Sequence, residues 1–482
     1  MKRIDKIHAF SLHDVTATRQ LERSAVTAQP EDQLLRQAGM AVAKLAIAIA
    51  PHASKIWIAC GSGNNGSDGL EAARLLLMWG KTVIITTLER DLETNCDRRA
   101  RDAGVVWAQN PPVDHDLCID AMPGIGQDSR PLSGRLAAWA YVMNTGMAPV
   151  LAIDNPTGLN PDTGHLPGIG VVADHTLCLL TLKPGLFTGR GRDLSGQVWL
   201  ESLGIHPTGG ADRPGLTQTA ILTGRPELMM RLHATHKGSY GDVGIIGGAA
   251  GMTGAAFLAG SAALQAGAGR VFVGLLDSAN LTLDVSQPEL MLRPPDTMEY
   301  IETTMVFGCG GGTLIATWLP KLLASSRRLV IDADAINALA QDQACRIAVR
   351  LRLGRGQFTV LTPHPLEAAR FLDTSVTQVQ SDRLAAARAI SDACQCTVVL
   401  KGSGTVIATP LKRTQINPTG NARLASAGTG DVLSGMIGAG LAAGLGAHDA
   451  ASRAVYKHGQ VADDWSLQSS LTAGSLSRSY LI

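Results

Sequence analysis

Three carboxylates follow apolar stretches in the N-terminal half of the chain, at the points where strands are expected to end. Asp68 lies in the glycine-rich segment GSGNNGSDG, Asp120 ends the stretch DLCID, and Asp154 ends the stretch VLAID. In an open α/β sheet the carboxyl ends of the strands meet in one crevice, where ligands bind. Carboxylates gathered there suit a bound cation or a proton transfer. Each aspartate also has a purely structural interpretation, as a helix cap or a turn former.

The glycine-rich segment permits a second interpretation. It matches the dinucleotide fingerprint G-x-G-x-x-G at Gly61, Gly63 and Gly66. Glu89 follows near the spacing at which an acidic residue binds a ribose in dehydrogenases. A helix that opens near Ser67 would offer free N–H groups to a phosphate. An ordinary NAD-dependent dehydrogenase therefore stays open on these residues, although hydride transfer has no need of clustered carboxylates.

A fourth aspartate, Asp431, lies in the segment SAGTGDVLSG near the C-terminus. Gly428 and Gly430 form a turn that opens a helix rich in Gly and Ala, and the N–H groups and dipole of such a helix favour an anion. A carboxylate beside that anion suits removal of a proton from a hydroxyl that attacks phosphorus. The alternative role of Asp431 is a helix N-cap. Asp332 and Asp334 either hold a metal, orient loops or are structural.

Two series of apolar runs, separated by helix-like segments, must position these groups. Such runs are typical of a parallel sheet covered on both faces. The first series of expected strands covers 55–61, 81–88, 116–124, 150–158 and 176–182. The second series covers 242–248, 270–276, 328–335, 358–364 and 397–404, and the last long helix 449–465. The stretch 206–220 is dense in Gly, Pro and Thr and is expected to link two domains.

The bulk composition narrows the class of protein. With 482 residues the chain is long enough for two domains. A net charge of +1 provides no field for nucleic acid or an anionic membrane, and we expect neither as a partner. The N-terminal segment has no apolar stretch typical of a signal peptide, and no run is long enough to span a membrane. The 8 cysteines are expected to be free, buried thiols of a cytoplasmic protein, and the spacing of Cys394 and Cys396 disfavours a zinc site.

The segments GSGNNGSDG, DLCIDAMPGIGQDSRPLSG and AIDNPTGLNPDTG resemble the NAD(P)H-hydrate epimerase domain over about residues 5–210. The resemblance implies epimerisation at C6 of hydrated NADH or NADPH, with Asp154 as the general acid/base. It implies potassium ligands at Asn65, Asp120 and Thr157. It also implies that hydrate is bound by Asn64, Asn65, Gly66, Ser67, Asp68, Gly124, Ile125, Gly126, Gln127, Asp128, Ser129, Arg130 and Asp154. Arg36, Met122 and Thr157 depart from the commoner family residues without removing a ligand.

The GTGD segment resembles the ribokinase-like superfamily, in which it carries the catalytic aspartate. Together with HKGSYGDVGIIGGAAGMTGAAFLAG, SQPELM, GCGGG, TPHPLE and LKGSG, it resembles the ADP/ATP-dependent NAD(P)H-hydrate dehydratases over about residues 215–475. The resemblance implies Asp431 as the catalytic base and hydrate binding by Ala255, Gly312, His364 and Asp431. It implies ADP binding by Lys401, Gly402, Ser403, Gly404, Thr405 and Gly430. Cys309 and Leu366 replace the usual Pro and Gly, and Leu366 is expected to tilt His364, which is either a cap or a substrate contact.

These observations predict a bifunctional repair enzyme of hydrated nicotinamide cofactors. The expected fold is α/β in two domains, a Rossmann-like α/β/α domain over 1–212 and a ribokinase-like domain over 213–482. The expected cofactors are K⁺ in the first domain, Mg²⁺ in the second, and ADP as the phosphoryl donor, with phosphate and AMP released. A homo-oligomer is expected. The alternatives are a ribokinase-like kinase of a vitamin or sugar alcohol, a non-catalytic dinucleotide sensor and an NAD-dependent dehydrogenase.

Overall fold

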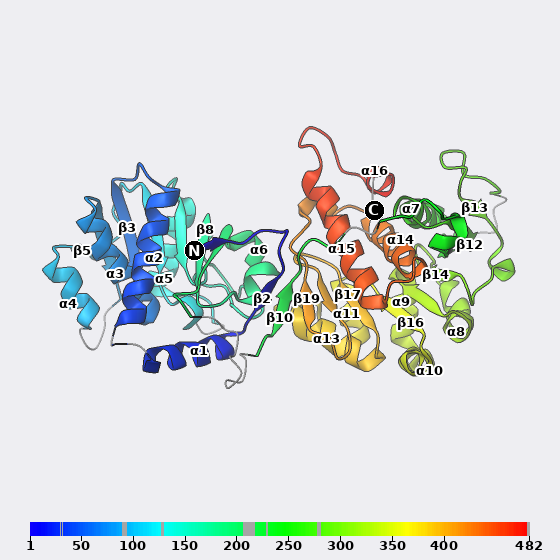
Figure 1. The fold of residues 1–482 in the computed structure, drawn as a ribbon, viewed down its shortest axis with the longest axis horizontal. Coiled ribbons are helices and arrows are strands. Elements are labelled where there is room, and N and C mark those ends of the chain that lie inside the picture. The colour runs from blue at the N-terminus through cyan, green and yellow to red at the C-terminus, as the bar shows by residue number, and fades with distance from the viewer. Residues whose placement is uncertain are drawn as a thin grey trace. The chain divides into compact units, whose positions relative to one another are not determined.

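The computed structural model describes residues 1–28, 30, 32–88, 94–126, 130–205, 217–227, 230–276 and 281–479. The chain divides into two compact units, drawn in Figure 1. The N-terminal unit comprises Met1–Asp5 and Phe10–Ile221, and the C-terminal unit comprises Lys6–Ala9 and Leu222–Ile482. The domain boundary predicted between residues 212 and 213 lies outside the described residues and stays a prediction.

The N-terminal unit is built on one sheet. Its strands are β1 (Lys2–Arg3), β3 (Lys55–Cys60), β4 (Thr82–Thr87), β5 (Val106–Ala108), β6 (Leu117–Ala121), β7 (Val150–Ile153), β8 (His175–Leu179) and β9 (Gln197–Glu201). The strand order is β1-β9-β8-β7-β6-β3-β4-β5, and only the pair β1–β9 is antiparallel. Chain order therefore reverses between β3 and β6, where an open α/β sheet forms its ligand crevice.

Helices cover both faces of this sheet. The helices are α1 (Val15–Ala28), α2 (Gln33–Ile49), α3 (Asn64–Met78), α4 (Asn95–Asp102), α5 (Gly134–Thr145) and α6 (Gly191–Leu194), with 3-10 turns η1 (Gly124–Gly126) and η2 (Pro184–Phe187). Alternate residues of β3 point to opposite faces. Ile56 and Ile58 pack in the core with α2 and α3, whereas Trp57 packs with Trp139 and Met143 of α5. The result is a three-layer α/β/α unit.

The C-terminal unit has a longer sheet. Its strands are β11 (Asp242–Gly247), β12 (Arg270–Leu275), β13 (Met291–Leu292), β14 (Thr304–Phe307), β15 (Arg328–Ile331), β16 (Phe358–Leu361), β17 (Thr397–Leu400), β18 (Val406–Ala408) and β19 (Thr414–Ile416). The order runs β13-β12-β11-β14-β15-β16-β17-β18-β19, parallel up to β17 and antiparallel beyond it. This sheet also reverses its chain order, between β11 and β14. The chain forms two further short strands, β2 (Phe10–Leu12) and β10 (Ala220–Leu222).

Two helices of small residues form the centre of the C-terminal core. The helices are α7 (Thr253–Gln265), α8 (Ile315–Ser325), α9 (Ala333–Gln341), α10 (Gln343–Arg352), α11 (Pro365–Leu372), α12 (Val376–Ser381), α13 (Arg383–Cys394), α14 (Thr429–Ala442), α15 (Ala447–Asp464) and α16 (Ala473–Ser477). The 3-10 turns are η3 (Lys237–Tyr240), η4 (Pro295–Thr297), η5 (Leu353–Arg355) and η6 (Ala422–Leu424). A Cβ on Gly435 of α14 would lie 2.0 Å from the carbonyl oxygen of Ala259 in α7. Glycine at position 435 therefore lets α7 and α14 touch along their backbones.

The sequence predicted most parallel strands but missed one central strand. All ten expected strand segments contain a strand, and the expected helix 449–465 is α15. The strand expected over 176–182 ends at Leu179, because Leu180 has a left-handed backbone with φ 64°. Strand β14 lies between β11 and β15 and was not predicted. Its four residues form a short apolar run, too short for periodicity to distinguish a strand from a helix.

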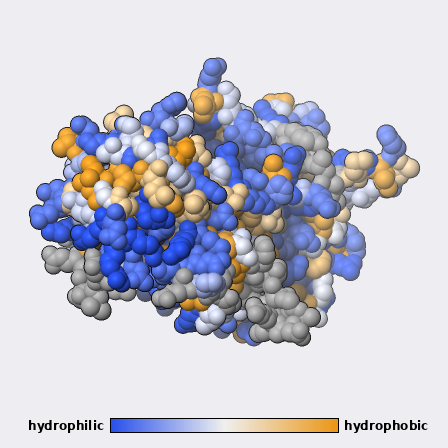
Figure 2. All heavy atoms as spheres, turned by 60° about the vertical axis from the view of Figure 1, so that its left-hand side comes forward, coloured by the Kyte–Doolittle hydropathy of each residue, from blue (hydrophilic) through white to orange (hydrophobic). Residues whose placement is uncertain are grey.

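The surface and the thiols agree with the composition. Figure 2 shows a face on which hydrophilic residues prevail and hydrophobic residues form small groups. All eight cysteines are free and buried, as predicted. Among the helices of the described residues, none has the length and apolar character needed to cross a membrane.

Candidate active sites

A cavity of about 640 Å³ opens in the N-terminal unit at the carboxyl ends of its strands. Its walls come from α1, α2, the start of α3 and the segments that follow β6, β7 and β8. Predicted hydrate-binding residues that line it are Asn64, Asn65, Ser67, Asp68, Ile125, Gly126 and Asp154. Gln127, Asp128 and Ser129, and Glu89 of the dehydrogenase alternative, lie outside the described residues. Gly66, Gly124 and Arg130 are described but are not among the residues that line the cavity.

The start of α3 presents backbone donors to this cavity. Gly63 is the N-cap residue, with an extended backbone and no side-chain cap. The first N–H groups of such a helix have no partner within the helix, and the dipole favours an anion there. A Cβ on Gly69 would lie 2.5 Å from the Cβ of Ala121, so glycine lets α3 approach the sheet at the end of β6. The local sequence thus builds the expected glycine-rich turn before α3, and its binding of phosphate stays a prediction.

The predicted potassium ligands lie around the buried Asp120 carboxylate. Thr157 donates to it twice, from its hydroxyl and from its backbone N–H, both at 2.8 Å. The Met122 N–H donates to the same carboxylate at 3.2 Å, and the Asn65 amide donates to the Met122 carbonyl at 2.8 Å. Burial raises the pKa of Asp120 to about 6, although the hydrogen bonds from Thr157 and Met122 act in the opposite direction. Asp120 and Thr157 are fully buried and Asn65 lines the cavity, so the side chains offer carboxylate, hydroxyl and amide oxygens as hard donors at the cavity wall.

Asp154 has a partner that the sequence analysis missed. Its backbone is left-handed, with φ 65°, which is uncommon outside glycine. Its carboxylate oxygen Oδ1 accepts hydrogen bonds from the Lys183 ammonium and from the Leu179 N–H, the latter at 3.2 Å. Lys183 is fully buried and lies four residues beyond β8. The signal available was a lone lysine in the apolar context TLKPG, directly after an expected strand.

Asp68 lies near Asp154 in the same cavity. Burial raises the pKa of Asp68 well above its ordinary value, and the negative charges of Asp154 and Glu22 raise it further. Glu22 of α1 accepts a hydrogen bond of 3.0 Å from the Asn64 side chain. The cavity therefore holds one carboxyl group beside a buried ammonium and another beside two carboxylates.

In the C-terminal unit, Asp431 lies in the first turn of α14. The N-cap residue is Gly428, with φ 88° and no side-chain cap, so Asp431 does not cap this helix. Burial raises the pKa of Asp431 to about 7, with a further increase from Asp332 and opposing effects from Cys309 and Lys401. A carboxylate with such a pKa is suited to general base catalysis near neutral pH.

Lys401 connects the nucleotide-binding turn to Asp332. Its ammonium donates to Asp332 Oδ1 at 2.7 Å, and Ser434 of α14 donates to Oδ2 at 2.7 Å. Burial lowers the pKa of Lys401, but Asp332, Glu367 and Asp431 outweigh this effect and the pKa is raised. A Cβ on Gly430 would lie 3.3 Å from the Lys401 Nζ, which places the ammonium beside the N-terminus of α14. Asp332 is thus the counter-ion of Lys401, and orienting a loop is not its main contact.

The predicted turn 401–405 joins β17 to β18 as an antiparallel hairpin. Gly402 has φ 134° and Gly404 has φ 60°, conformations that favour glycine. Arg383 donates to the carbonyls of Leu400 and Lys401, each at 3.2 Å, and so anchors the hairpin from α13. The backbone of the turn is therefore held in place before any nucleotide binds.

His364 is the N-cap residue of α11. Its Nδ1 accepts from the N–H groups of Leu366 and Glu367, at 3.1 and 3.3 Å, and Glu367 returns a bond of 2.7 Å to the His364 N–H. The ring edge at Nε2 lies 3.2 Å from Glu367 Oε1, and the side chain is 44% exposed. Leu366 lies within α11, so this position needs no glycine and the expected tilt of His364 has no basis in the geometry.

The loops near the switch of the second sheet bring the remaining predicted residues together. Gly312 has φ 56° and its N–H donates to Asp334 Oδ2 at 2.9 Å. A Cβ on Gly310 would lie 2.9 Å from the Ala255 side chain, so the loop rests on the start of α7. Cys309 is fully buried, and its sulfur lies within 4.8 Å of carboxylate oxygens of Asp332 and Asp431. The thiol donates to Asp431.

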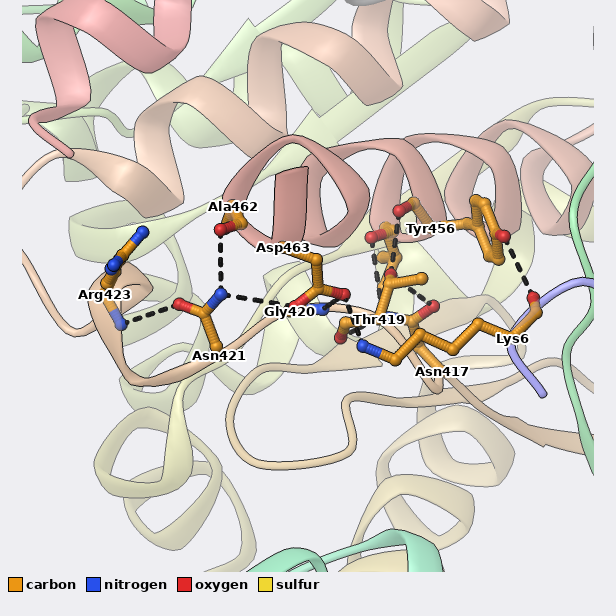
Figure 3. Close-up of polar contacts among 10 residues, drawn as sticks. Lys6, Asn417, Thr419, Gly420, Asn421, Arg423, Tyr456, Ala462 and Asp463 are labelled. Atoms are coloured by element: carbon orange, nitrogen blue, oxygen red, sulfur yellow. Dashed lines mark hydrogen bonds and ion pairs between the residues drawn. The ribbon is translucent and has the colours of Figure 1, made fainter. Parts of the chain in front are cut away.

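A polar network outside the predicted residues holds the loop that leads to Gly428. In Figure 3 this loop lies against α15. Thr419 donates to the Tyr456 carbonyl at 2.8 Å, and Asn421 donates to the Ala462 carbonyl at 2.8 Å. Asp463 accepts from the Gly420 N–H at 3.0 Å and from Lys6 at 2.7 Å. The signal available was the run INPTGN, in which polar residues follow an apolar strand.

Comparison with known proteins relates each unit to a protein family. Residues 31–185 match the family model of the YjeF-related protein N-terminus, and residues 243–480 match that of NAD(P)H-hydrate dehydratase. The bifunctional NAD(P)H-hydrate repair enzyme Nnr of Escherichia coli (strain K12) is 35% identical over 451 residues, which cover 89% of this chain and 84% of that protein. The ADP-dependent (S)-NAD(P)H-hydrate dehydratase of Neisseria meningitidis serogroup B is 40% identical over 276 residues, 55% of this chain and 91% of that protein.

A solved structure, the ADP/ATP-dependent NAD(P)H-hydrate dehydratase of Bacillus subtilis, is 30% identical, covers 52% of this chain and 91% of its own, and has a TM-score of 0.43. The two α/β units and the two family models confirm the predicted fold class, Rossmann-like followed by ribokinase-like. The extent and identity of the match over both units decide the family. The chain belongs to the bifunctional NAD(P)H-hydrate repair enzymes.

Proposed function

We propose that this chain returns hydrated NADH and NADPH to the intact cofactors. The N-terminal unit interconverts the R and S hydrates at C6, and the C-terminal unit dehydrates the S form with ADP as donor, releasing phosphate and AMP. Membership of the repair-enzyme family over most of the chain supports both activities. The alternative of a small-molecule kinase has no such support, because the relatives that span the chain are named repair enzymes.

The observation that carries the dehydration step is the position of Asp431. It lies in the first turn of a helix whose N–H groups are open to an anion, and its pKa is raised to about 7 by burial. Asp431 takes the proton of the C6 hydroxyl, and the oxygen attacks the terminal phosphorus of the nucleotide. AMP leaves as the new O–P bond forms. Phosphate is a better leaving group than hydroxide, so its loss from C6, together with loss of a proton from C5, restores the nicotinamide double bond. Removal of such a base costs on the order of 10²–10⁴ in rate.

We propose that Mg²⁺ accompanies the nucleotide in the C-terminal unit. The chain's own oxygens offer it little: Asp332 is engaged by Lys401 and Ser434, and the nearby sulfur of Cys309 is a soft ligand that Mg²⁺ disfavours. The nucleotide phosphates would therefore hold most of the ion, which neutralises phosphoryl charge when bound. The turn 401–405 and the N-terminus of α14 orient those phosphates.

We propose a potassium site at Asn65, Asp120 and Thr157. The donor set fits, because these side chains supply amide, carboxylate and hydroxyl oxygens, with Asp120 and Thr157 fully buried and Asn65 at the wall of the cavity. A cation there would favour the charged form of Asp120. The three residues also tie the loops after β3, β6 and β7 together, which holds the floor of the cavity beneath the hydrate.

Two coarser features of the chain accompany this proposal. The eight free, buried thiols suit a reducing compartment, and we propose that the protein acts in the cytoplasm as a homo-oligomer. Its substrates are small molecules, the hydrated dinucleotides and the nucleotide, with no nucleic acid or membrane as partner.

One assay tests the proposed function. A mixture of R and S hydrates is incubated with ADP or with ATP, with and without K⁺, and recovery of reduced cofactor is followed by its near-ultraviolet absorbance. Conversion of both epimers to reduced cofactor requires the activities of both units. Conversion of only the S hydrate shows that the C-terminal unit alone is active. A stable phosphate ester would favour a kinase, and tight binding without turnover would favour a sensor.

A further inference from the structure

Two carboxyl groups of the N-terminal cavity have opposite electrostatic surroundings. Asp154 follows β7 and Asp68 lies in the second turn of α3, so they approach the cavity from different elements. Pairs of carboxyl groups whose surroundings differ in this way divide into an acid and a base in many enzymes. Inversion at C6 by reversible ring opening needs both, because a proton leaves the C6 hydroxyl while another reaches the ring nitrogen.

Lys183 identifies the ionised member of the pair. Its side chain is fully buried, and its ammonium donates to Asp154 Oδ1, to the Leu179 carbonyl at 3.2 Å and to the Thr181 carbonyl at 3.1 Å. These three acceptors use all three of its donors. A buried ammonium requires a countercharge, and Asp154 supplies it. The ion pair therefore assigns the negative charge of the carboxyl pair to Asp154.

The Asp154 carboxylate keeps one oxygen for the ligand. Among the described residues, its side-chain hydrogen bonds from Lys183 and Leu179 both reach Oδ1. Oδ2 is the oxygen that can accept a proton from a molecule in the cavity. The left-handed backbone of Asp154 and the bond from its N–H to the Leu177 carbonyl, at 2.7 Å, hold this orientation.

Asp68 is the member whose surroundings favour a proton. It is buried in the wall of the cavity, and the charged groups that act on it most strongly are the carboxylates of Asp154 and Glu22. Burial and these two neighbours all raise the pKa of Asp68. The position of Asp68 near the open N–H groups of α3 places this proton beside the region where the dinucleotide is expected to bind.

We propose that Asp68 is the general acid and Asp154 the general base of epimer interconversion, and that Lys183 is the positioning residue that determines this assignment. The proposal rests on the proposed epimerase function. Asp154 removes the proton of the C6 hydroxyl, the electron pair left on that oxygen forms the carbonyl π bond to C6, the C6–N1 bond breaks with its electron pair going to N1, and Asp68 protonates N1. After rotation about C5–C6, Asp68 regains its proton from N1 as N1 attacks the other face of C6. Asp154 then returns its proton to the oxygen, so no co-reactant is consumed.

The main test uses the full chain without nucleotide and follows interconversion of separated epimers by chromatography. Asp68→Asn keeps the shape of a neutral carboxyl group, so the unit is expected to fold. We expect the protein-dependent rate to fall on the order of 10²–10⁴. If the wild-type chain interconverts the epimers and Asp68→Asn does so at the same rate, Asp68 is not the acid. If the wild-type chain does not interconvert them, the proposed function fails instead.

Glu22→Gln is the matched control, because it also removes a carboxylate from the wall of this cavity. It removes a negative neighbour of Asp68 and so lowers the pKa of Asp68. Since the acid works in its protonated form, the alkaline limb of the pH–rate profile is expected to move to lower pH while most of the rate at the optimum remains. A loss as large as that of Asp68→Asn would contradict the specific role of Asp68.

Lys183→Gln and Lys183→Arg test the assignment of the base. The glutamine retains a donor but removes the positive charge that faces the Asp154 carboxylate, so the acidic limb of the pH–rate profile is expected to move to higher pH. Arginine keeps the charge and is expected to leave that limb in place. A lower rate with an unmoved limb in Lys183→Gln would show a merely structural lysine. If Lys183→Gln does not melt cooperatively, two other measurements test the assignment. They are the position of the acidic limb in Lys183→Arg, expected to be unchanged, and the movement of the alkaline limb to lower pH in Glu22→Gln.

Discussion

The two units use the same pair of residue types, an aspartate and a buried lysine, in different partnerships. In the N-terminal unit Lys183 pairs directly with Asp154. In the C-terminal unit Lys401 pairs with Asp332, and Asp431 is left beside the Cys309 thiol. In the first unit the ammonium contacts the candidate base itself, whereas in the second unit burial raises the pKa of Asp431 to about 7 and Lys401 acts against this increase from its place beside Asp332. The two units therefore differ in whether the candidate base or a neighbouring aspartate makes the direct contact with lysine.

The starts of helices α3 and α14 also differ between the two units. Both α3 and α14 begin after a glycine that provides no side-chain cap. Gly63 has an extended backbone, with φ −94°, whereas Gly428 is left-handed, with φ 88°. Asp431 lies in the first turn of its helix, among the open N–H groups, and Asp68 lies one turn further on. Each unit thus combines the open N–H groups of a helix start with a carboxyl group. Only in the C-terminal unit do the open N–H groups and the carboxyl group lie in the same helical turn.

The largest expected effect is a loss of dehydration, without a loss of epimerisation, when Asp431 is replaced. Asp431→Asn removes the base of dehydration, and its rate is expected to fall on the order of 10²–10⁴, because general base catalysis contributes about that factor. Epimer interconversion in the same preparation is expected to stay unchanged. Recovery of reduced cofactor from pure S hydrate measures the first activity, and chromatography of the epimers measures the second. Equal losses in both activities would mean that the units do not work independently.

The pH dependence sharpens the comparison. Asp431 acts as a base in its ionised form, so dehydration is lost as the pH falls through about 7. At pH 6 its kcat/KM is expected to be about tenfold below the alkaline plateau, since a single base loses a factor of ten per pH unit below its pKa. Epimerisation is expected to keep its rate over this range, because its candidate base Asp154 is paired with the Lys183 ammonium rather than left beside a thiol. The pH–rate profiles of both activities, measured on one preparation, test this difference. An acidic limb near pH 7 in both profiles would contradict it.

A third variant tests the group around Asp120. Thr157→Val removes the hydroxyl that donates to the buried Asp120 carboxylate at 2.8 Å but keeps the backbone bond. Loss of one hydrogen bond to a buried acceptor is expected to lower the free energy of unfolding by about 1–3 kcal/mol. Urea unfolding of the variant, with Thr157→Ser as the control that retains the hydroxyl, measures this difference. A variant as stable as the wild type would show that the bond contributes no net stability.

The smallest expected effect concerns Cys309. Cys309→Ala removes the thiol that donates to Asp431, so the carboxylate loses a stabilising contact and its pKa rises. The acidic limb of dehydration is expected to move upward by less than about one pH unit, because a thiol is a weak donor. Cys309→Ser restores a donor and is expected to return the limb toward its original position. A downward movement in Cys309→Ala would assign the thiol the opposite role.

Local patterns in the sequence were sufficient to predict most of the parallel strands and the helix starts that follow them. Apolar runs bounded by Gly, Pro and Asp predicted the parallel strands, and the glycine-rich turns predicted the starts of α3 and α14. They were insufficient for β14, a short strand that is recognisable by its position between β11 and β15. They were also insufficient for Lys183, because nothing within its own segment distinguishes a buried counter-ion from a surface lysine at a strand end.

The amino-acid sequence by itself determined most element types and indicated the aspartates that we propose as catalytic, since periodicity, turn residues and helix caps are properties of neighbouring residues. Only the tertiary structure decided which lysine neutralises which aspartate. Lys183 lies 29 residues from Asp154, and Lys401 lies 69 residues from Asp332. Their pairing depends on the order of strands in each sheet, because that order sets which strand ends meet. Burial at those ends then sets the protonation of Asp68 and Asp431, and burial arises only once the sheets and helices have packed.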